Sequence, residues 1–261
     1  MAVSFSVLRK TPRDLVVVAV VCAAAGLGLL VDSVATLPLQ QALGVLAWGI
    51  LLGLMKGETW HVRIQAAIVV GIATAAEYLF SPHWHFYSYR FENVPLYVSP
   101  GHGMVYLAAA ALGRSDYFRR HHAWLTNLAL IGGTAWAAWG LFFAERGDMG
   151  GAALFALLFV FILVGRTHPL YVAAFFITTY LELVGTFYGN WAWATQWPFF
   201  GLSQANPPCG ISAGYCIFDA IAVAGAAAIA KTVDFAAARL RGSALPAWLD
   251  TPPAQEAYEE E

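Results

Sequence analysis

The sequence predicts an all-α integral membrane protein with about eight transmembrane helices. Of its 261 residues, 59% are hydrophobic and only 11% are charged, whereas soluble domains carry about 25% charged residues. A chain this apolar could not cover its surface with polar groups in water, so we expect the lipid bilayer to surround it. The net charge of −2 gives no reason to expect a nucleic-acid partner.

Seven apolar runs are long enough to cross the hydrocarbon core of a bilayer. An eighth run, 101–113, is shorter and spans only if the preceding 94–100 segment enters the membrane with it. The first run is longer than the core of a typical signal peptide, so we expect a membrane helix there. The seven runs are 14–32, 37–55, 62–80, 123–143, 150–166, 168–187 and 211–233.

The basic residues favour eight helices over seven. With the N-terminus inside, eight helices place twelve of the 14 lysines and arginines in cytoplasmic segments, and only Arg90 and Arg146 fall outside. This bias predicts a multi-pass protein of the plasma (cell inner) membrane with both termini in the cytoplasm. The membrane domain would cover 1–242, and the proline-containing, acidic tail 243–261 is expected to be disordered.

Two long non-helical segments, 81–100 and 188–212, are both expected on the outer side and resemble each other. Glu77 precedes the first, and Glu182, 105 residues later, precedes the second. In each segment two aromatic residues follow at alternate positions, then prolines, then a helix that starts with glycine. This similarity predicts two parallel four-helix repeats, 14–113 and 123–233, related by an axis along the membrane normal. The alternative is chance similarity between aromatic interfacial loops.

Three acids lie inside apolar helices near their predicted outer ends, namely Glu77, Glu182 and Asp219. An ionisable group at the centre of the bilayer costs roughly 2.5–3.5 kcal/mol on insertion scales, so such residues usually face the protein interior and mark a function. We therefore expect all three to face one cavity together with His102, and a protonated carboxyl group there could act as a general acid. The alternatives are acids that reach interfacial water or pair with Arg90.

Aromatic and amide side chains of the two outer segments are the candidate substrate-binding residues. The asparagines among them could instead only form turns. As a weaker alternative, His83, His85 and His102 could hold a metal with Glu77, as in a metal-dependent membrane oxidoreductase; otherwise no cofactor is expected. Cys209 and Cys216 could form a disulfide or remain free. The candidate substrate-binding residues are Trp84, Tyr87, Tyr89, Asn93, Asn190, Trp191, Trp193 and Asn206.

Two stretches, 84–106 and 182–202, resemble the integral membrane carotenoid-biosynthesis family, which includes carotenoid hydratases. That family has an acid near a helix end, a Gly-Thr and Gly-aromatic-x-aromatic run, and then a Val-Pro stretch before the next helix. This chain departs from the family by dividing the pattern between two segments and by using Trp where Tyr is usual. The matching residues are Glu182, Gly185, Thr186, Gly189, Trp191 and Trp193, with Val94, Pro95 and Pro100.

The resemblance implies a polyisoprenoid substrate and the addition of water or a proton to a double bond. Together with the buried acids, it leads us to expect a membrane-embedded enzyme that acts on a lipid or isoprenoid at the outer side of the bilayer. Hydration, cyclisation and isomerisation all fit carboxylic acid chemistry. The alternative function is a non-catalytic transporter or a lipid-binding membrane subunit.

The predicted topology can be checked by cysteine labelling in intact cells. The substitutions Tyr87→Cys and Trp193→Cys should react with a non-permeant maleimide, because both segments are expected outside the membrane. Arg119→Cys, in a predicted cytoplasmic segment, should react only after permeabilisation. Labelling of residue 87 or 193 only after permeabilisation would contradict the predicted topology.

Overall fold

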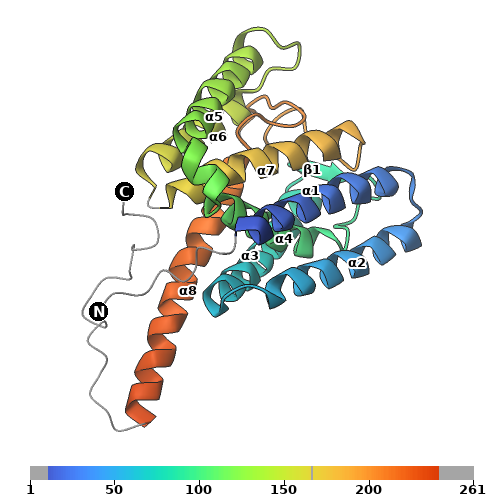
Figure 1. Ribbon diagram of the computed structural model, residues 1–261. Helices are drawn as coiled ribbons and strands as arrows, with labels where there is room; N and C mark the ends of the chain where they lie inside the picture. Colours follow the sequence, from blue (N-terminus) through green and yellow to red (C-terminus); the bar gives the residue numbers. More distant parts are fainter. Residues whose placement is uncertain (1–10, 166, 241–261) are drawn as a thin grey trace.

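The computed structural model of the chain describes residues 11–165 and 167–240. This part folds into eight α-helices, one π-helical turn and two short strands (Figure 1). The predicted tail 243–261 and the basic residues 9, 10, 166 and 241 lie outside the described residues. The elements are α1 (Thr11–Val34), α2 (Leu37–Lys56), α3 (Trp60–Tyr78), η2 (Leu79–His83), β1 (Tyr87–Tyr89), α4 (Val98–Gly113), α5 (Asp116–Phe142), α6 (Met149–Val164), α7 (His168–Phe187), β2 (Trp191–Trp193) and α8 (Ser212–Leu240).

Six helices in the described part of the chain, α1, α2, α3, α5, α7 and α8, are long and apolar enough to cross a membrane. A helix of 20 residues, such as α2 or α7, is about 30 Å long, which is the thickness of the hydrocarbon core. The six helices indicate a multi-pass membrane protein. α4 and α6 have 16 residues each and are shorter.

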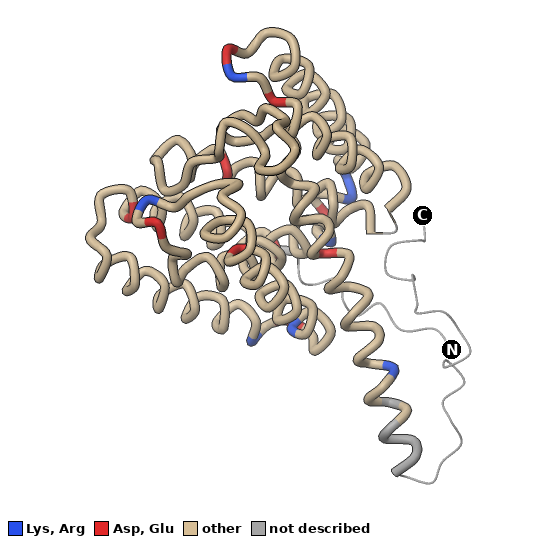
Figure 2. The backbone as a smooth tube through the Cα atoms, turned by 180° about the vertical axis from the view of Figure 1, so that it is seen from behind, with Lys and Arg blue, Asp and Glu red and all other residues tan. Residues whose placement is uncertain are grey.

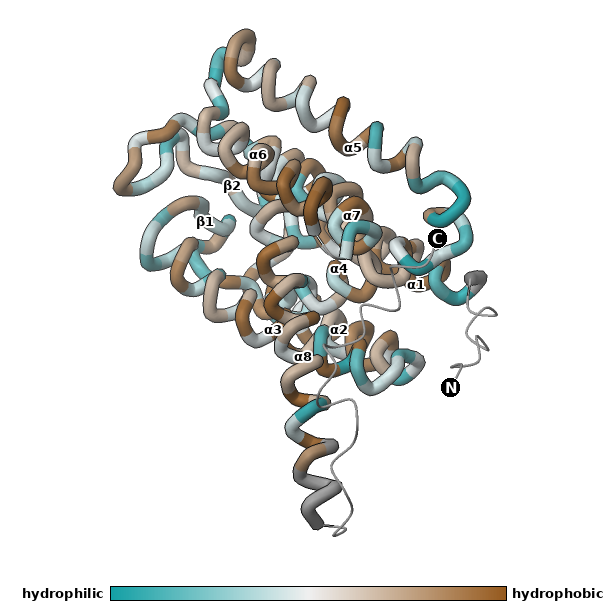
Figure 3. The backbone as a smooth tube through the Cα atoms, turned by 90° about the vertical axis from the view of Figure 1, so that its left-hand side faces the viewer, coloured by the Kyte–Doolittle hydropathy of each residue, from teal (hydrophilic) through white to brown (hydrophobic). Residues whose placement is uncertain are grey.

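The exterior of the helices is apolar, as lipid contact requires. Val34 is 83% exposed, Phe142 75% and Phe187 83%, and apolar stretches recur along the helices in Figure 3. Charged residues gather mostly at helix ends and in the connecting segments (Figure 2). Apolar side chains are therefore both the core and the outer surface of this fold.

The predicted start of α5 is wrong by seven residues. α5 begins at Asp116 rather than at 123, because Ser115 caps it: the Ser115 hydroxyl accepts a hydrogen bond from the Phe118 amide at 3.1 Å. A run of apolar residues does not reveal this start, since the first two turns of α5 are polar. Sequence capping signals of this kind mark helix starts better than hydropathy does.

α4 is the central helix, and residues 102–111 are all buried. It packs against α1, α2, α3 and α7. Small residues allow this close approach; a Cβ atom on Gly113 would lie 2.9 Å from the Pro169 carbonyl oxygen of α7. Because protein surrounds α4 on all sides, its length does not have to match the bilayer, which explains the short apolar run in the sequence.

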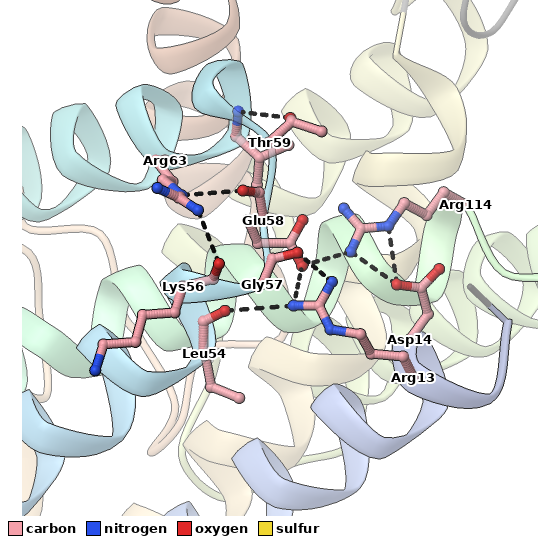
Figure 4. Close-up of polar contacts among 10 residues, drawn as sticks. Arg13, Asp14, Leu54, Lys56, Gly57, Glu58, Thr59, Arg63 and Arg114 are labelled. Atoms are coloured by element: carbon pink, nitrogen blue, oxygen red, sulfur yellow. Dashed lines mark hydrogen bonds and ion pairs between the residues drawn. The ribbon is translucent and has the colours of Figure 1, made fainter. Parts of the chain in front are cut away.

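A cluster of charges closes one end of the bundle (Figure 4). Asp14 of α1 and Glu58 of the α2–α3 turn are buried, and the Arg114 guanidinium lies 2.8 Å from a carboxylate oxygen of each. Arg13 lies 3.3 Å from Glu58. Two guanidinium groups thus neutralise two buried carboxylates, and the pairs join α1, the α2–α3 turn and the end of α4.

The two outer segments meet in a short antiparallel ladder that the sequence did not predict. β1 pairs with β2, with Tyr87 opposite Trp193 and Tyr89 opposite Trp191. The strands are more than 100 residues apart in the chain, so this pairing joins its two halves. Cys209 and Cys216 are both free and buried, so the structure contains no disulfide between them.

Packing between α5 and α6 can be tested with two adjacent glycines. A Cβ atom on Gly133 would lie 2.1 Å from the Phe155 ring of α6, whereas one on Gly132 would have nothing within 4 Å. We expect Gly133→Ala to lower the free energy of unfolding by about 1–3 kcal/mol through overpacking. Gly132→Ala should be neutral or stabilising, because alanine favours a helix. Thermal unfolding in detergent measures both; equal midpoints would contradict the packing.

Candidate functional site

Glu77 is a buried carboxylate with three hydrogen-bond partners. It lies one residue before the end of α3, which continues into η2, and is 7% exposed. Its Oε2 accepts hydrogen bonds from the Tyr87 hydroxyl at 2.7 Å and the Tyr89 hydroxyl at 2.8 Å. Its Oε1 lies 2.8 Å from Nε2 of His102. The three contacts offset part of the cost of burying the acid.

Glu182 of α7 is bound in the same way by the other strand. It is 4% exposed, and its Oε2 accepts hydrogen bonds from the indole N–H groups of Trp191 at 3.0 Å and Trp193 at 3.1 Å. Alternate residues of a strand point to the same face, so each strand directs two aromatic donors at one acid.

His102 of α4 and Tyr215 of α8 contact each other. Their rings stack with centroids 5.1 Å apart and planes 26° apart. Phe218 also packs against the His102 ring, at a centroid distance of 6.0 Å. Contacts therefore run from Glu77 of α3 through His102 of α4 to Tyr215 of α8.

The two tyrosines that contact Glu77 are hydrogen-bond donors. Burial, followed by the charge of Glu77, raises the pKa of the Tyr87 and Tyr89 hydroxyls well above the usual tyrosine value, so both remain protonated donors. The two hydroxyls therefore donate to Oε2 of Glu77, while Oε1 is left for the contact with Nε2 of His102.

These groups lie in the wall of a cavity of about 710 Å³. This is within the usual range of 300–1,000 Å³ for small-molecule sites. Apolar and aromatic side chains from both halves of the chain form most of the wall. Three of the lining residues, Leu46, Phe200 and Ile217, are 59%, 71% and 38% exposed, so the cavity reaches the apolar exterior of the protein.

Most of the predicted site residues line this cavity. They are Glu77, Glu182 and His102 with Trp84, Tyr87, Tyr89, Trp191 and Trp193. Asp219 is the exception among the acids: it is 3% exposed and buried in α8, one turn beyond Tyr215, but it does not line the cavity. The expectation that all three acids face one cavity is wrong for Asp219, because its α8 position lies beyond the cavity wall that Tyr215 and Phe218 form.

The three asparagines have structural partners and do not line the cavity. Asn190 donates to a carboxylate oxygen of Asp32 at 2.7 Å and to the Leu29 carbonyl. Asn93 donates to Gln40, and Asn206 accepts from the Trp193 amide. The asparagines therefore do not contact a ligand in this cavity, as predicted, but hold the outer segments against α1, α2 and β2.

The metal alternative lacks ligands in the structure. His83 and His85 are exposed and outside the cavity wall, while His102 already contacts Glu77. Within the described residues, no group of three or more His, Cys, Asp or Glu side chains could hold a metal ion. Arg90 pairs with Asp32, at 3.8 Å, rather than with any of the three predicted acids.

Sequence reasoning missed five polar residues of this region. Tyr215 and Gln204 line the cavity, while Asp32 accepts from both Gln40 and the Tyr97 hydroxyl at 2.9 Å. The available signal was an acid, Asp32, at the end of the first apolar run, of the same kind as Glu77 and Glu182. Tyr215 had no comparable signal: it lies four residues before Asp219, but Asp219 does not line the cavity.

No protein-family model, curated protein or solved structure matches this chain. Its function is therefore inferred from the geometry of the site and from the sequence.

The tyrosine donors to Glu77 can be tested by stability measurements. Tyr89→Phe removes one donor to a buried carboxylate and should lower the free energy of unfolding by about 1.5 kcal/mol. Tyr78→Phe is the control, since Tyr78 is 58% exposed. Thermal unfolding of the purified protein should show a lower midpoint for Tyr89→Phe only. A midpoint equal to that of the control would contradict the bond.

Proposed function

We propose that this chain is a membrane-embedded enzyme that acts on a lipid or polyisoprenoid by acid–base chemistry of its buried carboxyl groups. The observation that supports this is the pair of acids, Glu77 with His102 and Glu182 with Trp191 and Trp193, in the wall of an otherwise apolar cavity. Convergent titratable groups in a large apolar cavity are the usual sign of an active site.

Glu182 is the proposed general acid. Oε2 accepts from two indole N–H groups, which can only donate, so a proton on this carboxyl group belongs on Oε1. A carboxylic acid in a dry site can give that proton to a carbon–carbon double bond. The pair of electrons of the double bond then forms the new C–H bond and leaves a carbocation on the neighbouring carbon.

Aromatic faces support a cationic intermediate. Trp191, Trp193, Tyr215 and Phe218 all line the cavity, and the face of an aromatic ring attracts a cation within about 6 Å. Loss of a neighbouring proton would complete an isomerisation, attack by water a hydration, and attack by a second double bond a cyclisation. All three reactions begin with the same protonation.

The apolar opening of the cavity favours a lipid substrate. Leu46, Phe200 and Ile217 are exposed where the cavity reaches the exterior, and a long apolar chain could enter there directly from the bilayer. A polyisoprenoid is also what the resemblance to the carotenoid-biosynthesis family implies. The runner-up is a transporter or a lipid-binding subunit, and a transporter would need this cavity to open in turn to both aqueous sides.

The finer architecture also belongs to the proposal, namely eight spans in two parallel repeats. Three observations support it: β1 and β2 pair about a centre at Ser88 and Ala192, each acid accepts from two aromatic residues of the strand that follows it, and α3 packs on α8 as α4 packs on α7. α1 fits the pattern only in part: it packs on α2 as α5 packs on α6, but it packs mainly on α4, whereas α5 packs mainly on α6. We place the site on the outer side, with both termini in the cytoplasm, from the distribution of basic residues.

The function can be tested by lipid mass spectrometry of a strain from which the gene is deleted. We expect one isoprenoid or other lipid to accumulate and a related product to disappear. Restoring the wild-type gene should restore the product, while Glu182→Gln should leave less than about 1% of it, since an amide has no acidic proton to give.

Glu92→Gln is the matched control, because Glu92 is an exposed acid of the same outer region. It should restore the product fully. Unchanged lipids in the deletion strain, or full activity of Glu182→Gln at equal protein levels, would overturn the proposed function.

A further inference from the structure

The cavity extends beyond the two acids in two directions, which we call the first arm and the second arm. Residues of α1 and α2 line the first arm, and residues of α6, α8 and the outer segment 197–204 line the second. α2 packs on α1 and α4, whereas α8 packs on α3, α6 and α7, so the arms lie on different sides of the bundle. Glu77, His102 and Glu182 line the cavity between them.

The first arm follows one face of α1. The residues of α1 that line it recur at the spacing of a single helix face. At a rise of about 1.5 Å per residue, this face covers about 12 Å along the helix axis. Glycine leaves the arm open, because a Cβ atom on Gly28 would have nothing within 4 Å. The lining residues are Val21, Ala24, Ala25, Gly28 and Leu29.

The opposite wall of the first arm is one face of α2. Leu43, Leu46, Ala47 and Ile50 line the cavity, again at the spacing of one helix face. Leu46 is also 59% exposed. The first arm is therefore aliphatic, and it reaches the apolar exterior at α2.

The second arm has a glycine in a matching place on α8. Gly214 lines the cavity one residue before Tyr215, and a Cβ atom on Gly214 would also have nothing within 4 Å. Phe200 and Ile217 line the same arm and are 71% and 38% exposed. The second arm therefore also reaches the apolar exterior, at a place separate from Leu46.

The charges of the wall exclude an anionic lipid head group. Among the described residues that line the cavity, two are glutamates and none is a lysine or an arginine. A phosphate or carboxylate group would lie beside acids of the same sign without a cation to pair with, and such contacts are strongly unfavourable. The cavity therefore suits an uncharged chain along its whole length.

We infer that the ligand of this cavity is a single uncharged apolar chain that runs through both arms, with an internal position of the chain at the acids. This inference rests on the proposed function, and it places the reacting double bond inside the chain and not at its end. Gly28 and Gly214 are then specificity-determining residues, because each keeps one arm open. A ligand that reacts at its end would fill only one arm.

Native mass spectrometry of the purified full-length protein in detergent tests the use of both arms. The probes are two saturated hydrocarbons, which cannot be protonated at a double bond: squalane, and farnesane, whose chain is half as long. Squalane should reach into both arms, whereas farnesane should fill one. We therefore expect one squalane molecule or two farnesane molecules on each saturated protein.

Gly28→Leu and Gly214→Leu each place a side chain in one arm. Each should weaken squalane binding about tenfold, which corresponds to the burial of about two methylene groups, and should leave room for one farnesane molecule. Gly49→Leu is the matched control, because Gly49 is exposed on α2, lies outside the cavity wall and has nothing within 4 Å of its Cβ position. It should bind both probes as the wild-type protein does.

Two results would overturn the inference while leaving a lipid-binding cavity. One is a single farnesane molecule on the saturated wild-type protein, and the other is squalane binding that only one of the two arm variants weakens. Should an arm variant fail to fold, the number of farnesane molecules on the wild-type protein still decides. Binding of neither probe would instead contradict the lipid site of the proposed function, so the two failures are distinguishable.

Discussion

The structure depends on one constraint: a carboxylate inside an apolar helix bundle must receive hydrogen-bond donors from the protein. Glu77 is bound by two tyrosine hydroxyls and an imidazole, and Glu182 by two indole N–H groups. These partners are on the two outer strands and on α4. The acids therefore determine where the outer segments lie, and they make those segments part of the core.

The β1–β2 ladder shows how the donors are shared between the halves of the chain. Each strand follows its own acid, yet each strand pairs only with the other, so Tyr89 lies against Trp191 with ring centroids 6.1 Å apart. Moving one strand would remove donors from one acid and also shift its partner. Asn190, bound to Asp32 of α1, ties the same ladder to the first helix. A displacement of the strand at one acid site would therefore also displace the hydrogen-bond donors of the other acid site.

The sequence predicted most of the helices because lipid contact requires long apolar runs, and it predicted Glu77, Glu182, His102 and the aromatic pairs because polar groups in such runs are costly. It missed the strands, because each has only three residues, too few for an alternating pattern to be recognised. It also missed Gln204 and Tyr215, which become polar wall residues only when segments far apart in the chain meet. Asp219 was misplaced because it lies one helical turn beyond Tyr215 along α8, past the residues that line the cavity.

The sideways opening at Leu46, Phe200 and Ile217 has a kinetic consequence. A molecule that enters from the bilayer is supplied by diffusion in two dimensions, so occupancy depends on its mole fraction in one leaflet and not on its concentration in water. Adding more membrane at a fixed amount of that molecule would dilute it and slow its capture. For a ligand that enters this way, the properties of the surrounding lipid, including its fluidity and thickness, affect how fast the cavity fills.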